Sequence, residues 1–306
     1  MKIRFALVGI SVTALLYFSI LVWIEYKNGL GSKIFMLYDF MPILIGLSIF
    51  SFFLRYLRWH WLLYRANHNV SFKLGFVAYL TGFAFTISPG KVGELIRIRY
   101  FEPLGVPRHH IISAFIFERA LDLVVVLFIS SLASVNFGIS PYVFALVVIA
   151  LILLLVLNPR MIEHVAIYYD KRQWKTTSRF VRIVHQGLKN IKNWMNPLDM
   201  AVSLALGFLA WTALSIAFVL LLIYLDITIP IFTAISIYPL SMLSGAASMI
   251  PGGVGSTEAT TVAILLFYKA PLTIAVVAAI GIRISTLWLS VFLGLVSIWI
   301  MERRIN

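Results

Sequence analysis

Charged residues lie next to two Pro-Gly turns inside otherwise apolar stretches of the sequence. The first turn reads Pro89-Gly90-Lys91-Val92-Gly93-Glu94, and the second reads Pro251-Gly252-Gly253-Val254-Gly255, with Glu258 three residues later. Proline removes a backbone donor and glycine tolerates almost any turn, so a helix is expected to break at each motif. The apolar segment that follows each motif carries an arginine, Arg119 or Arg283. Charges in such surroundings need a partner or a function.

The charges of the first turn could pair with one another or bind an anion. Glu94 and Arg97 lie three residues apart, so an ion pair across one helical turn is expected. Lys91 lies in the turn itself, where its ammonium could contact a lipid phosphate. The motif therefore predicts a paired acid and base beside a cation that could bind a headgroup.

A second group of charges lies along one face of the following helix. Glu118 and Asp122 are four residues apart, and Arg119 lies three residues before Asp122. Two neighbouring carboxylates could hold a proton between them, because like charges disfavour each other. Alternatively, they are structural counter-ions for Arg119 or Arg97. Both interpretations remain open at the level of sequence.

Glu258 has Arg283 as its expected partner, either as a pin between two segments or as part of a site. A lipid headgroup cannot cross bare hydrocarbon, so its passage requires a polar patch where such charges converge. Half-helix N-termini after Gly90 and Gly253 would add positive dipole ends that favour an anion. The candidate substrate-binding or translocation residues are Lys91, Glu94, Arg97, Glu118, Arg119, Asp122, Glu258 and Arg283, and the hairpin turns comprise Pro89, Gly90, Gly93, Pro251, Gly252, Gly253 and Gly255.

The composition identifies lipid as the surroundings of these charges. Of the 306 residues, 61% are hydrophobic and 12% are charged, and the mean hydropathy is +0.96; soluble domains have roughly 45–50% apolar and about 25% charged residues. These values exclude a soluble enzyme, a disordered chain and a secreted disulfide scaffold, and the long apolar runs exclude an outer-membrane barrel. Without cysteine, disulfides and thiolate chemistry are excluded. The net charge of +13 indicates loops against anionic headgroups rather than a nucleic-acid partner.

The apolar stretches predict an all-α, polytopic integral membrane protein. A helix needs about 20 apolar residues to cross the hydrocarbon core. Region 72–101 is interrupted by the first Pro-Gly turn and is too short for two crossings, so a re-entrant hairpin is expected. Region 229–268 is interrupted by the second turn and could be a re-entrant hairpin or two full spans. Six full spans are predicted at 5–24, 40–57, 111–134, 141–157, 198–224 and 272–300.

Basic residues orient the predicted spans. The loop 158–197 carries eight lysines and arginines against two acidic residues, so it is expected on the cytoplasmic side. With the first segment re-entrant, this assignment places both termini in the cytoplasm. We expect a multi-pass protein of the plasma (inner) membrane.

The two Pro-Gly motifs predict an internal repeat of opposite orientation. In this topology the first hairpin enters from the cytoplasm and the second enters from outside, which is the arrangement of an inverted repeat around a midplane site. The chain is then one transmembrane domain, 1–306, with half-repeats at about 40–134 and 198–300 and the basic loop 158–197 between them. The alternative is a pair of unrelated kinks in ordinary spans.

Segment 55–65 combines three arginines with interleaved aromatic residues. Arg55, Arg58 and Arg65 share one helical face. Such a segment is typical of an interfacial belt that anchors a helix at the membrane surface, and it could also collect anionic headgroups. The anchoring role is the favoured interpretation.

Several catalytic signatures are absent from the sequence. It has no Gly-x-x-x-x-Gly-Lys-Ser/Thr motif for ATP and no Gly-x-Ser-x-Gly elbow. The six histidines lack metal-binding spacing, and the adjacent His109 and His110 are a poor chelate. We therefore expect no enzyme activity, no catalytic residues, no cofactor and no metal.

Three motifs occur in the order typical of a known membrane family. They are SPGKVGELIR at 88–97, FERALD at 117–122 and PGGVGSTE at 251–258. In these motifs the chain resembles the lysylphosphatidylglycerol synthase transmembrane-region family of flippase-like proteins, over nearly its whole length. The resemblance implies lipid movement between leaflets, and relatives accompany polyisoprenyl-glycan and hopanoid pathways. The full synthases carry a soluble aminoacyl-transferase domain after the membrane region, whereas this chain stops at Asn306, so a stand-alone member without lysyl transfer is expected.

These features predict a lipid flippase or transporter without an ATPase of its own. Its expected substrate is an anionic phospholipid or a polyisoprenyl-phosphate-linked lipid. The alternative is a non-transporting accessory subunit that presents lipid to a membrane glycosyltransferase or synthase. Expected partners are membrane lipids with anionic headgroups and, in the alternative, a lipid-glycan or envelope-biosynthesis enzyme.

Overall fold

The computed structural model of the protein describes residues 37–133 and 194–305, together with a few isolated positions. The regular elements within these ranges are helical, and no strand occurs in them. Three helices of the described chain are long and apolar enough to cross a membrane: Met41–Arg65, Pro197–Tyr224 and Leu272–Arg304. The all-α class and the membrane character expected from the composition are confirmed.

The first described part is a long helix, a folded-back segment and a second long helix. Within the folded-back segment, α4 contacts α5 and η1 contacts η2, so residues 72–101 double back at the first Pro-Gly turn; we call this segment the first hairpin. The elements are α3 (Met41–Arg65), α4 (Phe72–Leu80), η1 (Thr81–Phe85), η2 (Pro89–Ile96), α5 (Arg97–Phe101), η3 (Glu102–Leu104) and α6 (Arg108–Ser131).

The second described part also contains a folded-back segment. Here α12 contacts α13 on either side of the second Pro-Gly turn, and we call residues 231–267 the second hairpin. A single π turn, η6, interrupts the last long helix directly after Arg283; such turns occur frequently at functional sites. The elements are α11 (Pro197–Tyr224), α12 (Ile231–Ala247), η5 (Pro251–Gly253), α13 (Ser256–Phe267), α14 (Leu272–Arg283), η6 (Ile284–Trp288) and α15 (Leu289–Ile305).

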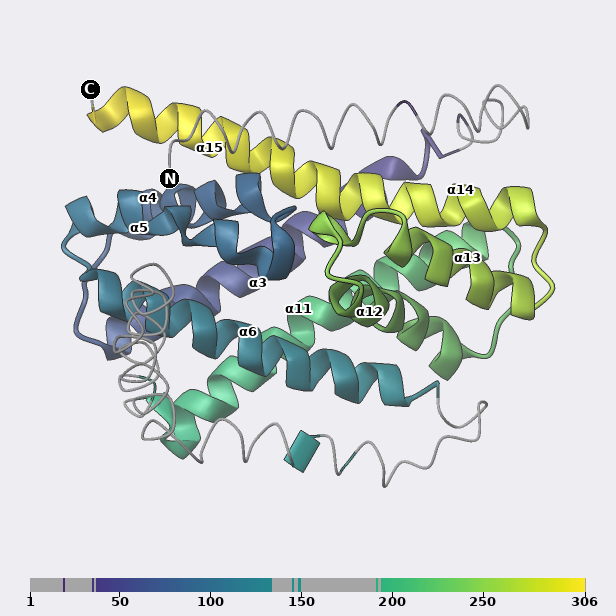
Figure 1. The fold of residues 1–306 in the computed structure, drawn as a ribbon, viewed down its shortest axis with the longest axis horizontal. Helices are drawn as coiled ribbons and strands as arrows, with labels where there is room; N and C mark the ends of the chain where they lie inside the picture. Colours follow the sequence, from purple (N-terminus) through teal and green to yellow (C-terminus); the bar gives the residue numbers. More distant parts are fainter. Residues whose placement is uncertain are drawn as a thin grey trace, which may run out of the picture.

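The two hairpins lie at opposite ends of the molecule and point toward its centre (Figure 1). Between them α3 packs along α11, and the hydroxyl of Ser51 donates a hydrogen bond of 2.8 Å to the carbonyl oxygen of Ala210. The helix formed by α14, η6 and α15 runs over both hairpins, because α15 contacts α4 and η1 while α14 contacts α13. This arrangement brings the two Pro-Gly turns to the same place.

Two clusters of buried apolar side chains support the two hairpins. One lies among α3, α4 and α6 and contains Tyr56 and Trp59; the other lies among α11, α12 and α14 and contains Phe218. Large apolar side chains also face outward, as expected where lipid replaces water as the solvent. Those exposed on the long helices include Phe50, Phe208, Ile223, Phe292 and Trp299.

Two of the described spans differ from the prediction. The helix expected at 40–57 continues to Arg65, because segment 55–65 is helical and most of it, up to Leu63, is packed inside the protein. The span expected at 111–134 corresponds to α6, which carries Glu118 and Asp122 and is not among the three apolar spans. The predicted spans 5–24 and 141–157 and nearly all of the basic loop lie outside the described residues.

Gly294 on α15 lies directly against the backbone of η1, where a Cβ atom would overlap Ala84. We expect Gly294→Ala to lower the free energy of unfolding by about 1–3 kcal/mol, the usual cost of overpacking a tight contact. Gly46 on α3 is the matched control, because a Cβ there would meet no atom within 4 Å; Gly46→Ala should be neutral or stabilising. Thermal unfolding in detergent tests the pair, and equal midpoints for the two variants would contradict the prediction.

Candidate functional site

The first Pro-Gly turn is held by hydrogen bonds that display a lysine at its tip. The hydroxyl of Ser88 donates to the carbonyl oxygen of Phe85 (2.8 Å) and accepts the backbone N–H of Gly93 (2.6 Å). Gly90 and Lys91 both have left-handed backbone conformations, with φ of 60° and 56°. This conformation costs a non-glycine residue such as Lys91 roughly 1–2 kcal/mol. The turn thus holds Lys91, a cation, at the tip of the hairpin in a strained backbone conformation.

The second Pro-Gly turn is tied to the last long helix by an arginine. The guanidinium of Arg283 donates to the carboxylate of Glu258 (2.9 Å) and to the carbonyl oxygen of Gly252 (2.6 Å). The same carboxylate accepts the backbone N–H of Gly255 (2.9 Å). The expected ion pair between Glu258 and Arg283 is therefore present, and it fixes the turn against α14.

The tips of the two hairpins touch at the centre of the molecule. A Cβ atom on Gly252 would lie 3.4 Å from the Cα atom of Ile87, and η2 contacts η5. A cavity of about 140 Å³ lies at this junction. It is close in size to an engineered protein cavity that admits benzene, so a phosphate-sized group fits inside it.

The cavity is lined by cations from four different elements. They are Arg55 of α3, Lys91 of the first turn, Arg119 of α6 and Arg283 of α14, and the single carboxylate among the described lining residues is that of Glu94. Apolar, aromatic and hydroxyl side chains complete the walls, and the hydroxyls belong to Thr86, Ser88, Thr257, Thr286 and Ser290. The tertiary structure therefore collects positive charge at the point where the two broken helices meet.

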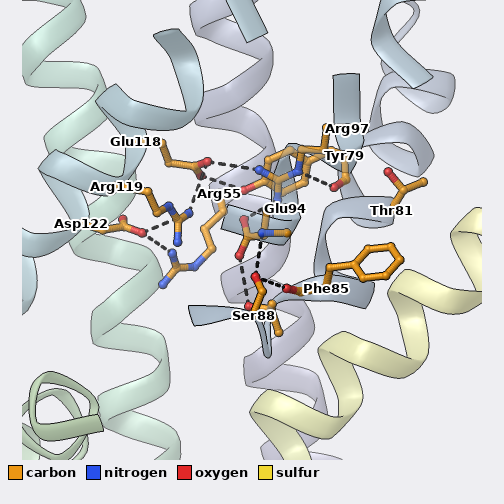
Figure 2. A network of polar contacts seen from close by, with 12 residues as sticks. Arg55, Tyr79, Thr81, Phe85, Ser88, Glu94, Arg97, Glu118, Arg119 and Asp122 are labelled. Atoms are coloured by element: carbon orange, nitrogen blue, oxygen red, sulfur yellow. Dashed lines mark hydrogen bonds and ion pairs between the residues drawn. The ribbon is translucent and has the colours of Figure 1, made fainter. Parts of the chain in front are cut away.

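Two carboxylates of α6 contact Arg55 and Arg119 from behind the cavity. Asp122 accepts hydrogen bonds from Arg55 (2.6 Å) and Arg58 (2.8 Å) and lies 3.4 Å from the guanidinium of Arg119. Its side chain is almost fully buried, as are those of Arg55 and Arg58. Figure 2 shows Asp122 facing Arg55 and Arg119 from α6. These three contacts favour the counter-ion interpretation of Asp122 over a proton shared with Glu118.

Glu118, one helical turn before Asp122, has contacts of the same kind. Its carboxylate accepts hydrogen bonds from Arg58 (2.9 Å) and from the hydroxyl of Tyr79 (2.7 Å). It also lies 3.5 Å from Arg97 and 3.3 Å from Arg119. The side chain is completely buried, so every one of these contacts is sheltered from water.

Arg97 connects the α6 carboxylates to the first hairpin. Its guanidinium forms an ion pair of 3.1 Å with Glu94, as expected from the sequence, and donates from Nε to the carbonyl oxygen of Tyr79 (2.9 Å). It also stacks over the ring of Tyr79 at 3.9 Å from the centroid, a cation–π contact. Figure 2 shows Arg97 between this tyrosine and Glu118. We call the linked residues the arginine–carboxylate network; its members are Arg55, Arg58, Glu94, Arg97, Glu118, Arg119 and Asp122.

Lys91 stands apart from this network. Within the described residues, its ammonium has no hydrogen bond and no ion pair, although it lines the cavity. Nε of Arg119 also lacks a hydrogen-bond partner there, whereas its Nη2 lies 3.3 Å from the carboxylate of Glu118 and 3.4 Å from that of Asp122. Lys91 is therefore the one lining cation for which the described chain provides no ion-pair partner.

The interpretation of segment 55–65 as an interfacial belt is wrong for two of its three arginines. Arg55 is 5% exposed and Arg58 is 0% exposed, because both point into the protein toward Asp122. Arg65 does lie near the helix end, with a 40% exposed side chain paired to Asp199 at 2.9 Å. Sequence reasoning thus missed that Arg55 and Arg58 belong to the buried site. One signal was available in the sequence: α3 contains three arginines and no acidic residue, so its buried arginines need carboxylate partners from other helices.

Tyr79 is a further network residue that the sequence did not single out. It contacts Glu118 through its hydroxyl and Arg97 through its carbonyl oxygen and its ring. A tyrosine in an apolar helix carries no pattern that separates a network member from a core residue. Only the packing of the first hairpin against α6 reveals its role.

Of the two expected helix N-termini, one belongs to a very short helix and the other already contacts a carboxylate. After Gly90 the backbone forms a short 3₁₀ turn, and the α-helix that follows, α5, has only five residues. In the second hairpin, the N-terminus of α13 is already occupied by the carboxylate of Glu258. The formal positive charge of this cavity comes from its four side-chain cations.

Most of the candidate residues come together at this junction, but in different positions. Lys91, Glu94, Arg119 and Arg283 line the cavity. Arg97, Glu118 and Asp122 lie behind the cavity, and Glu258 binds Arg283. The remaining candidates form the turns: Pro89, Gly90, Gly93, Pro251, Gly252, Gly253 and Gly255.

The described histidines form no metal site. His68 contacts His110 at 2.6 Å, and burial lowers the pKa of His68. No group of three potential metal ligands was found in the described ranges.

Two comparisons with known proteins gave a match. The profile of the family described as lysylphosphatidylglycerol synthase TM region matches residues 6–294. The chain belongs to this family. It is also similar to the UPF0104 membrane protein MJ1595 of Methanocaldococcus jannaschii, with 22% identity over 277 residues that cover 81% of each chain. No solved structure matches the chain.

The family profile covers both Pro-Gly turns and the FERALD segment. The matched residues include both hairpins, α6 and the α14–α15 helix up to residue 294. The resemblance noted in the three motifs is thus confirmed over nearly the whole chain. The relative's printed name describes a membrane protein and carries no substrate.

Proposed function

We propose that this membrane protein is a lipid transporter that moves an anionic phospholipid or a polyisoprenyl-phosphate-linked lipid between leaflets. The observation that carries the proposal is the cation-lined cavity at the junction of the two hairpins. An anionic headgroup crossing a bilayer needs a polar path sheltered from hydrocarbon. A cavity lined by four cations and by several serine and threonine hydroxyls suits such a headgroup.

The lengths of the broken helices support a re-entrant arrangement. α12 has 17 residues and α13 has 12, which at 1.5 Å per residue correspond to about 26 Å and 18 Å. Both are shorter than the roughly 30 Å hydrocarbon core. We therefore propose that residues 72–101 and 231–267 are re-entrant hairpins of an inverted repeat, with half-repeats at about 40–134 and 198–300.

The same proposal places the protein in the plasma (inner) membrane with both termini in the cytoplasm. The positive-inside rule supports this orientation through the basic loop 158–197. Transport then follows the lipid gradient or is coupled to protons. Glu94, Glu118 and Glu258 are the candidate proton carriers, but the arginine contacts of Glu118 favour a bracing role for it.

Lys91 provides the sharpest test of transport, because removing an unpaired cation breaks no ion pair within the described chain. Wild-type protein and Lys91→Met would be reconstituted in liposomes containing fluorescent phosphatidylglycerol or a fluorescent polyprenyl phosphate. Transfer between leaflets is expected for the wild type, and the rate for Lys91→Met is expected to fall at least about tenfold.

Lys73→Met is the matched control, since Lys73 is exposed at the start of α4, away from the cavity. Its transfer rate should stay within about twofold of the wild type. If no lipid is transferred by well-folded wild-type protein, the transporter proposal is wrong. Co-purification of a glycosyltransferase or synthase would then support the accessory-subunit alternative.

A further inference from the structure

The buried charges around the cavity do not balance. Five arginines belong to this region, counting the four of the arginine–carboxylate network and Arg283, and Lys91 adds a sixth cation. The carboxylates in contact with these arginines number four, the three of the network and Glu258. Among the described residues, the excess is therefore two positive charges.

The excess charge faces the cavity rather than the protein interior. The three network carboxylates are shared among four arginines, and two of these arginines, Arg55 and Arg119, line the cavity together with Lys91. Arginine is always protonated in proteins, so the imbalance cannot be relieved by loss of a proton from Arg119 or Arg283. An anion in the cavity would supply the missing counter-charge.

The size of the imbalance distinguishes between two kinds of lipid phosphate. A phosphate diester, as in phosphatidylglycerol, carries one negative charge. A phosphate monoester has a second pKa near 6 and carries about −1.5 to −2 charges at pH 7. We propose that the cavity selects a phosphate monoester headgroup over a phosphate diester and over a zwitterionic headgroup. This inference rests on the proposed transport function and names the substrate class of the same site.

The rim of the cavity indicates that the phosphate is attached to an apolar chain. Met249 and Ile250 lie at the tip of the second hairpin, directly before the Pro-Gly turn. They line the cavity and are 69% and 45% exposed. Exposed apolar side chains beside a polar cavity suit a ligand with a charged head and a hydrophobic tail. A volume of about 140 Å³ holds the head alone, so the tail lies along this rim.

Two measurements on the full chain test the proposal. In the first, liposomes contain fluorescent phosphatidic acid, phosphatidylglycerol or phosphatidylcholine with identical acyl chains, and transfer is compared at pH 7.5 and 5.5. The monoester is expected to move about tenfold faster than the diester at pH 7.5. The ratio should shrink at pH 5.5, where the monoester holds its second proton. Protein-free liposomes correct for spontaneous movement.

In the second measurement, ligand binding is followed in detergent by the shift in thermal unfolding midpoint. Lysophosphatidic acid is expected to raise the midpoint more than lysophosphatidylglycerol of the same chain length, and Lys91→Met should remove this difference while Lys73→Met keeps it. Inorganic phosphate and glycerol 3-phosphate, which have no tail, should give little shift. If inorganic phosphate or glycerol 3-phosphate shifted the midpoint as much as lysophosphatidic acid does, the ligand would be a soluble phosphate, and the proposal of a lipid headgroup would be overturned.

The outcomes separate the two proposals. Equal transfer of monoester and diester would overturn the selectivity while leaving lipid transport intact. Faster transfer of phosphatidylcholine than of either anionic lipid would overturn the inference that the excess positive charge of the cavity binds an anionic headgroup. Transfer of no lipid at all would overturn the transport proposal and, with it, the substrate assigned here.

Discussion

Replacing Glu118 with glutamine is expected to cause the largest loss of stability of any single neutralisation in the protein. The carboxylate is completely buried and contacts Arg58, Arg97, Arg119 and the hydroxyl of Tyr79. Removing one partner from a buried ion pair leaves an uncompensated charge and costs about 3–5 kcal/mol. We expect a thermal unfolding midpoint in detergent well below that of the wild type.

Glu102→Gln is the control for this prediction. Glu102 also forms an ion pair, with Arg108 at 3.1 Å, but both side chains are exposed by more than a third. Exposed pairs contribute at most about 1 kcal/mol, so the midpoint should barely move. Similar midpoints for Glu118→Gln and Glu102→Gln would show that the arginine–carboxylate network does not brace the fold.

A disulfide between the hairpin tips is expected to stop lipid transfer. A Cβ atom on Gly252 would lie 3.4 Å from the Cα atom of Ile87 and 3.4–3.5 Å from its side-chain carbons, so two cysteines at these positions would lie in direct contact, as a disulfide requires. The natural chain has no cysteine, so Ile87→Cys/Gly252→Cys can form only the intended bond within one chain. If a headgroup passes between the tips, oxidation should abolish transfer and reduction should restore it.

The single substitutions Ile87→Cys and Gly252→Cys control for effects other than the bond. Gly252 has a φ of +65°, a conformation that strains any L side chain, so Gly252→Cys alone is expected to lower stability. Neither single variant should respond to reductant. Full transfer by the oxidised double variant would contradict separation of the tips as a step of transport.

The network explains why a protein in lipid carries so many ionised groups near its centre. Arg55 and Arg58 of α3, the α6 carboxylates and Arg97 come from elements that the chain places far apart. Their mutual contacts hold the first hairpin, α3 and α6 together at the cavity. Any change to the lining cations therefore acts on both stability and binding, which is why the unpaired Lys91 is the cleaner probe.

Local ion pairs were the part of the site that sequence spacing predicted well. Glu94 and Arg97 are one helical turn apart, so a helix alone brings them together, and the pair is present at 3.1 Å. The pairing of Glu258 with Arg283 was also expected, since both are isolated charges in apolar segments. The functional roles assigned to these residues remain predictions.

Long-range contacts were the part that sequence spacing could not predict. Arg55 and Arg58 combine with aromatic neighbours in a pattern that also describes a membrane-surface belt, and the distinction depends on which way the helix faces. Asp122, 64 residues beyond Arg58, decides that orientation. No periodicity within α3 contains this information.

The sequence by itself determined the solvent of this protein, its helical class and the places where two helices break. These properties follow from composition and from the backbone chemistry of proline and glycine, which act locally. Only the tertiary structure decided that the two breaks touch and that four cations line one cavity. Charge balance across a buried site is a sum over distant segments, so it becomes visible only when packing has brought those segments together.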